Sequence, residues 1–137
     1  MASKFIALPK SVSEKSFAAA IAEFRRIVGQ DSVLVTAEQL APYIKTMMPV
    51  PDADHTPSAA LLATTVEQIQ KIVGICNTYK VPIWMISTGR NFGYGSAAPA
   101  ERGQVVLDLK RMNRILEVDQ DLCFALVEPG ITYKQLY

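Results

Sequence analysis

The residues best suited to bind a ligand lie in a glycine-rich stretch that follows an apolar segment. The stretch reads Ser87-Thr88-Gly89-Arg90-Asn91-Phe92-Gly93-Tyr94-Gly95-Ser96. Glycines adopt positive φ angles and let backbone N–H groups converge on an anion. Ser87, Thr88 and Asn91 add neutral hydrogen-bond donors, and Arg90 can contact a phosphate through two parallel hydrogen bonds. This combination suits a pyrophosphate, and the alternative is a flexible turn between two strands.

Two common phosphate-binding motifs do not account for the stretch. No Gly-Lys-Ser or Gly-Lys-Thr occurs, which excludes a Walker P-loop. Residues 93–98 match the pattern G-x-G-x-x-A, but a Rossmann fold needs a helix directly afterwards, and Pro99 and Gly103 argue against one. Any phosphate would therefore be bound by the loop backbone itself, without a helix N-terminus.

The elements that must position this stretch follow from the spacing of apolar residues. The pattern predicts helices over 11–28, 36–44 and 66–76 and from 132 onward, and strands over 32–35, 59–63, 81–86, 104–109, 115–118 and 122–127. Predicted helix caps are Ser11 (in a capping box with Glu14), Thr36, Thr64 or Thr65, and Thr132, with Gly29 ending the first helix. Strand, helix and strand over 59–86 favour parallel pairing. The spacing therefore predicts a βαβ-like unit with further strands.

A proline-rich connector over residues 45–57 separates two parts of the chain. Its three prolines each bias the preceding residue toward extended backbone, and the segment has no sustained periodicity. We therefore predict an N-terminal helical arm and connector over 1–53 and a ligand-binding part over 54–137.

Composition excludes several classes of function. Fourteen basic and 13 acidic side chains leave a net charge of +1, which gives no electrostatic case for nucleic acid or an anionic membrane surface. No apolar run approaches the ~18 residues of a membrane span, and no signal peptide is recognisable, which favours the cytoplasm. One histidine and two distant cysteines do not form a familiar zinc site. Cys76 and Cys123 are expected to be reduced thiols that are buried as hydrophobic side chains. Trp84 and Met85, in their apolar strand, are also expected to lie in the core.

Several blocks, in order, resemble the vanillyl-alcohol oxidase/p-cresol methylhydroxylase flavoprotein family. They are residues 47–50 with 57–59, the glycine-rich stretch within 82–99, Met112-Asn113-Arg114-Ile115-Leu116-Glu117-Val118, and Val127-Glu128-Pro129-Gly130-Ile131-Thr132-Tyr133. The likeness covers nearly the whole chain. It implies an α+β fold class, as the first subdomain of a p-cresol methylhydroxylase-type FAD-binding domain, with the second subdomain missing.

The resemblance implies a cofactor, a substrate class and site residues. Family members bind FAD and oxidise para-substituted phenols by hydride transfer to the flavin. By position, Ser87, Thr88, Gly89, Arg90, Asn91, Phe92, Gly93, Tyr94 and Gly95 would surround the FAD pyrophosphate. Tyr94 matches the family tyrosine that helps to hold the substrate as phenolate, and its alternative is a structural loop aromatic. The acid/base residues lie downstream in the family, so no catalytic residue is assigned here and this chain alone is expected to be inactive.

The family likeness also implies partners. A cytochrome c subunit as electron acceptor, an oligomeric full-length protein and a periplasmic location are all compatible with it. Arg90 has a second interpretation, as an ion-pair partner of Asp108. Some family oxidases use a histidine near the position of His55 to assist covalent flavin attachment, but a solvated connector residue is the simpler interpretation. Rival functions for the whole chain are a non-catalytic α/β module that binds a nucleotide or another anion, and a structural subunit of a larger assembly.

Overall fold

A four-stranded sheet organises the chain in the computed structural model, which describes residues 5–88 and 96–137. Its strand order is β1-β2-β4-β3, formed by β1 (Val33–Leu34), β2 (Ala59–Leu62), β4 (Val105–Asp108) and β3 (Ile83–Ile86). Strands β2 and β3 both pair in parallel with β4, whereas β1 pairs antiparallel with β2. The predicted parallel sheet is confirmed, but β4 lies between the two strands of the βαβ unit.

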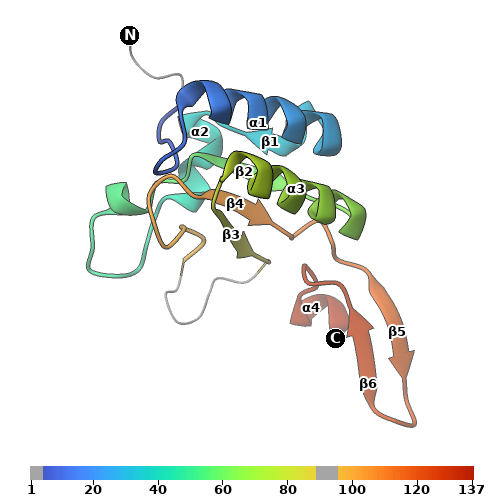
Figure 1. Cartoon of the computed structure of the whole chain (residues 1–137). Helices are drawn as coiled ribbons and strands as arrows, with labels where there is room; N and C mark the ends of the chain where they lie inside the picture. Colours follow the sequence, from blue (N-terminus) through green and yellow to red (C-terminus); the bar gives the residue numbers. More distant parts are fainter. Residues whose placement is uncertain (1–4, 89–95) are drawn as a thin grey trace.

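Two long helices, α1 (Glu14–Val28) and α3 (Val66–Tyr79), cover one face of this sheet (Figure 1). The core on this side combines alternate strand residues with the apolar stripes of both helices, and its fully buried members include Phe17, Phe24, Leu61, Ile72, Val105 and Leu107. Alternation follows because successive side chains of a strand point to opposite faces. Residues before and after position 53 therefore share one core, and the predicted division at this position stays a prediction.

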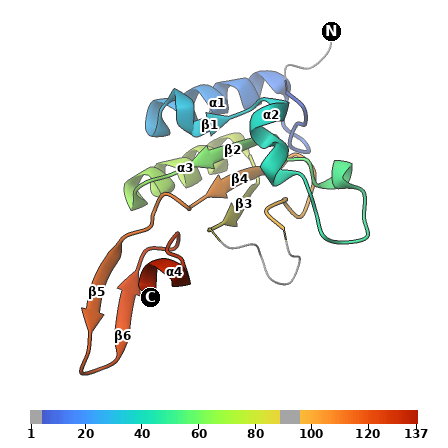
Figure 2. The same cartoon turned by 180° about the vertical axis from the view of Figure 1, so that it is seen from behind.

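The opposite face is covered by shorter elements (Figure 2). Helix α2 (Ala37–Leu40) continues into a 3-10 turn over Ala41–Tyr43, and a second such turn follows over Asp52–His55. Leu40 and Tyr43 pack against Ala60 and Val106, which are the alternate residues of the two central strands. The predicted helix over 36–44 thus splits, because Pro42 has no N–H with which to continue α-helical hydrogen bonding.

Helix caps agree with the sequence at most positions. Thr36 and Thr132 each form a capping box with the glutamine three residues later, and Thr65 caps α3. The predicted capping box at Ser11 is wrong: Ser13 is the N-cap of α1 and accepts a hydrogen bond from the Ser16 N–H. Ser11 has a φ of 64°, whereas an N-cap needs extended backbone.

A hairpin of β5 (Ile115–Asp119) and β6 (Phe124–Val127) projects away from the main sheet and is followed by the short helix α4 (Tyr133–Leu136) (Figure 1). Much of its apolar surface is exposed, including Val118 (62%) and Leu126 (51%). Cys123 lies in the hairpin turn with a φ of 55° and is exposed, so the prediction that it is buried is wrong. Met85 was likewise expected in the core but is 59% exposed, because α1 and α3 do not cover this end of the edge strand β3.

Candidate functional site at the carboxyl edge of the parallel strands

The three parallel strands end side by side, and the glycine-rich stretch begins at this edge. Ile86 of β3 and Leu62 of β2 both pair with Asp108 at the end of β4. Ligands of open α/β sheets bind outside the carboxyl ends of parallel strands. Ser87 and Thr88, the first two predicted cofactor residues, follow β3 directly at this edge. The fold therefore starts the predicted pyrophosphate loop at the edge where such folds bind ligands.

Ser87 and Thr88 are the predicted site residues that the structure describes. Ser87 is half-buried, and Thr88 is exposed. The Thr88 hydroxyl donates a hydrogen bond to the backbone carbonyl of Gly130. The other predicted cofactor residues, Gly89, Arg90, Asn91, Phe92, Gly93, Tyr94 and Gly95, lie outside the described residues, as does the proposed substrate contact of Tyr94. Their roles therefore stay predictions.

Residues 97–104, which follow the glycine-rich stretch, form bends, turns and irregular backbone rather than a helix. This confirms the expectation, based on Pro99 and Gly103, that no Rossmann helix begins there. A phosphate at this edge would therefore not be bound by the N-terminus of a helix that begins immediately after the glycines.

A buried carboxylate lies at the end of β4. Asp108 is 2% exposed, and its Oδ2 accepts from the Tyr43 hydroxyl at 2.7 Å and pairs with the Lys110 Nζ at 3.0 Å. Burial and the neighbouring carboxylate raise the pKa of Tyr43 well above its ordinary value, so it remains a neutral donor. The alternative role of Arg90, as a partner of Asp108, concerns a residue outside the described part of the chain.

The base of the hairpin is fixed by a second ion pair. The Arg114 guanidinium donates to Glu128 Oε1 from Nε at 3.1 Å and from Nη2 at 2.6 Å, and the Arg114 backbone N–H donates to Oε2 at 2.8 Å. These hydrogen bonds lower the pKa of Glu128 and raise that of Arg114. Glu128 is 6% exposed, so the pair orients the chain on its way to Gly130.

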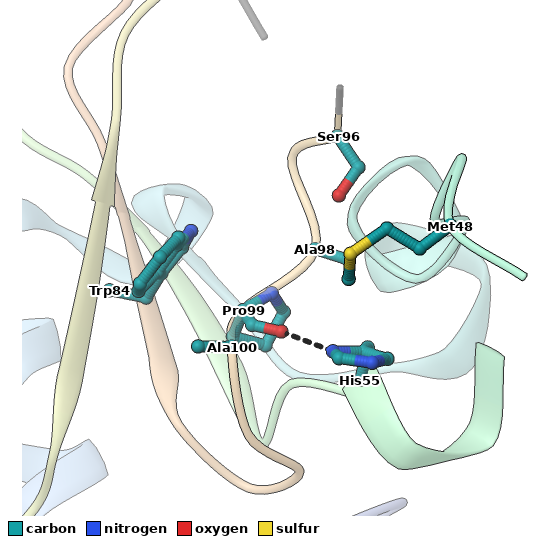
Figure 3. Close-up of a pocket in the computed structure, with 7 residues that line it drawn as sticks. All are labelled: Met48, His55, Trp84, Ser96, Ala98, Pro99 and Ala100. Atoms are coloured by element: carbon teal, nitrogen blue, oxygen red, sulfur yellow. Dashed lines mark hydrogen bonds between the residues drawn. The ribbon is translucent and has the colours of Figure 1, made fainter. Parts of the chain in front are cut away.

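A cavity of about 130 Å³ lies beside the segment from Ser96 to Ala100 (Figure 3). Figure 3 shows Trp84 on one side of this segment and His55 with Met48 on the other. The His55 Nδ1 lies 2.8 Å from the Pro99 carbonyl oxygen and must carry the proton, since a carbonyl oxygen only accepts. The Trp84 Nε1 is buried and has no hydrogen-bond partner among the residues that the structure describes. His55 is thus an anchored connector residue, and Trp84 is half-buried beside a cavity rather than fully in the core.

The sequence reasoning missed Tyr43, Lys110 and the tight packing around Gly130. One signal in the sequence was available: Asp108 ends an apolar strand, and a carboxylate buried there requires hydrogen-bond or ion-pair partners. The pattern could not say which partners, since Tyr43 and Asp108 are separated by 65 positions.

Two absences hold for the described residues. Within 5–88 and 96–137, no three His, Cys, Asp or Glu side chains are grouped to hold a metal ion. No helix in this part of the chain combines the length and apolar character needed to cross a membrane.

Comparisons with known proteins agree with this geometry. The chain is 61% identical over 130 residues to the 4-cresol dehydrogenase [hydroxylating] flavoprotein subunit of Pseudomonas putida, a match that covers 95% of this chain and 25% of that protein. A solved structure of p-cresol methylhydroxylase with substrate bound superposes with a TM-score of 0.92 at 60% identity, over 96% of this chain and 25% of the other. A 4-ethylphenol oxidase from Gulosibacter chungangensis, solved with isoeugenol, gives 0.89 at 40% identity, over 95% and 25%.

These relatives define the family and the extent of the match. The chain spans about a quarter of their length. The resemblance to the vanillyl-alcohol oxidase/p-cresol methylhydroxylase flavoproteins is confirmed, as is the α+β fold. A family model described as an FAD binding domain matches residues 57–137, a range that contains β2, β3, β4 and the whole glycine-rich stretch. The chain therefore belongs to the FAD binding domain family.

Proposed function

We propose that these residues form part of an FAD-dependent oxidoreductase that acts on para-substituted phenols. The observation that carries the proposal is the superposition on substrate-bound p-cresol methylhydroxylase, with a TM-score of 0.92 at 60% identity. In this proposal the glycine-rich stretch at the carboxyl edge of β3 binds the FAD pyrophosphate. The donors suit that group, because backbone N–H groups and neutral hydroxyls can approach a phosphate closely.

The substrate would contact Tyr94. FAD, when bound, supplies an acceptor for the hydride that leaves the para substituent of the phenol. Hydrogen-bond donors around the phenol oxygen favour its ionised form, and a phenolate pushes electron density toward the para carbon. Tyr94 is proposed as one such donor. A cytochrome c subunit as electron acceptor and an oligomeric holoenzyme belong to the same proposal, supported by the likeness to a protein named as a flavoprotein subunit.

The first test is the visible spectrum of the full-length protein that contains these residues. Expression with added FAD is expected to give a yellow protein whose flavin bands bleach on anaerobic addition of 4-cresol. A folded, colourless product that gains no flavin absorbance would overturn the proposal. Flavin bands that never bleach with phenols would favour the rival of a non-catalytic nucleotide-binding module.

The second test separates substrate binding from cofactor binding at Tyr94. Tyr94→Phe is expected to lower phenol turnover by about 10- to 100-fold, because one stabilising donor is lost where charge develops, while FAD content stays near that of the parent protein. Tyr133→Phe is the matched control, since Tyr133 is 91% exposed in the described structure and has no assigned role. Equal losses of turnover and FAD content for Tyr94→Phe would show that Tyr94 is a structural loop residue.

A further inference from the structure

Thr88 is the second residue of the glycine-rich stretch and the last one described before Ser96, and its side chain already forms a hydrogen bond. Its hydroxyl donates to the Gly130 carbonyl, across 42 positions of sequence, although the residue is exposed. A hydroxyl has a single proton to donate. In this geometry that proton is directed at Gly130 and not at an anion.

The acceptor is held in place by its surroundings. The Gly130 N–H donates to the Met112 carbonyl at 2.7 Å. A Cβ at position 130 would lie 2.5 Å from the Leu109 carbonyl oxygen and 2.7 Å from that of Met112, so only glycine fits here without a shift of the backbone. The position of the Gly130 carbonyl is therefore set by backbone groups that have little room to move.

The same turn connects back to β3. The Leu109 N–H donates to the Ile86 carbonyl at 2.9 Å, and the Met112 N–H donates to the Leu109 carbonyl at 2.9 Å. Hydrogen bonds thus run from Ile86 through the 109–112 turn and Gly130 to Thr88. Ile86 and Thr88, on either side of Ser87, are both connected to this turn, Ile86 directly and Thr88 through Gly130. The chain consequently leaves β3 in a defined direction.

We propose that the Thr88 hydroxyl is a positioning group for the FAD-binding loop, acting through Gly130 and not as a direct phosphate ligand. The inference rests on the proposed function, because it assumes that FAD binds at this edge. The geometry favours it over direct contact, since a hydroxyl that turned to a phosphate would leave the Gly130 carbonyl without this donor. Fixing the root of the loop before FAD arrives reduces the ordering cost of binding.

The experiment uses the full-length protein, stripped of FAD, and compares Thr88→Val with Thr88→Ser. Two quantities are measured: the Kd of the initial noncovalent complex with FAD, by quenching of flavin fluorescence, and the melting temperature of the FAD-free protein. Thr88→Val is expected to weaken FAD binding by about 3- to 10-fold, the usual worth of one hydrogen bond. It should also lower the melting temperature of the FAD-free protein, whereas Thr88→Ser retains both values.

Thr78→Val is the matched control. Thr78 is an exposed threonine on α3 whose hydroxyl donates to the Gly74 carbonyl at 3.0 Å, so the same type of bond is removed far from the loop. FAD affinity should stay within about twofold of the parent protein, since no bond at the carboxyl edge is lost.

Each other outcome overturns the inference. Weaker FAD binding with an unchanged melting temperature of the FAD-free protein would make Thr88 a direct ligand. A lower melting temperature with unchanged FAD affinity would make the bond purely structural, and no change in either would remove any role. If the parent protein does not bind FAD at all, the proposed function fails before Thr88 is examined.

Discussion

Removing the hydroxyl of Tyr43 tests whether the N-terminal segment and the carboxyl edge of the parallel strands form one cooperative unit. This hydroxyl joins the turn after α2 to the buried carboxylate of Asp108, at 2.7 Å. Tyr43 is 4% exposed and Asp108 is 2% exposed, so water cannot replace the bond without a rearrangement. Tyr43→Phe keeps the ring and removes the hydroxyl, which donates to Asp108 and also accepts from the Lys110 Nζ at 3.3 Å.

The magnitude follows from the partners that remain. A hydrogen bond to a charged group contributes about 1.5–3 kcal/mol. After the substitution, Asp108 still pairs with the Lys110 Nζ at 3.0 Å and accepts from the Lys110 backbone N–H at 2.9 Å. The carboxylate is therefore not left alone, and we expect a loss of about 1.5–2 kcal/mol, the lower part of that range.

Urea unfolding followed by circular dichroism measures this loss. Tyr79→Phe is the matched control: its hydroxyl also donates to a carboxylate, Glu23 Oε1 at 2.6 Å, but in a half-exposed setting where water can compete, so a smaller loss is expected. A double-mutant cycle of Tyr43→Phe with Asp108→Asn should give a coupling energy of about 1 kcal/mol or more. A coupling near zero would refute the reasoning. Two separate unfolding transitions would instead support an independent segment over residues 1–53.

Three further predictions concern backbone geometry, thiol reactivity and pH. Gly103→Ala should destabilise the fold by about 2 kcal/mol more than Gly29→Ala in urea unfolding. Both glycines have φ near 89°, but only at Gly103 would a Cβ overlap the backbone of the N-terminal arm. Equal losses of stability for the two variants would contradict this. Cys123 is exposed and should react with a thiol reagent in the native chain. Burial raises the pKa of Cys76 to about 12, so Cys76 should react only after unfolding. Fast labelling of the native Cys123→Ser variant would contradict this. The pKa of Glu128 is held below its ordinary 4.5, so the stabilisation from its ion pair is present above that value and is lost as the pH falls through the lower folded pKa. Melting temperatures between pH 7 and 3 should therefore fall less steeply for Glu128→Gln, and an unchanged slope would argue against the pair.

Local sequence chemistry was sufficient for the helices and for the class of fold. Gly29, Thr36, Thr65 and Thr132 end or begin helices where predicted, because each acts through hydrogen bonds and backbone angles of residues within one turn. Local signals also misled, for example at Ser11, since its side chain fits a capping box but its backbone does not. The glycine-rich stretch and its family likeness likewise depended on contiguous residues.

The sequence by itself therefore determined the order of elements, the parallel sheet and the place where the predicted pyrophosphate loop starts. Only the tertiary structure decided that β4 lies between β2 and β3, and that Asp108 receives the Tyr43 hydroxyl. It also decided that the Thr88 hydroxyl is directed at Gly130. The physical reason is the same in each case. These partners are tens of residues apart, and a residue's type records that it needs a hydrogen-bond or packing partner, but not which distant group provides it.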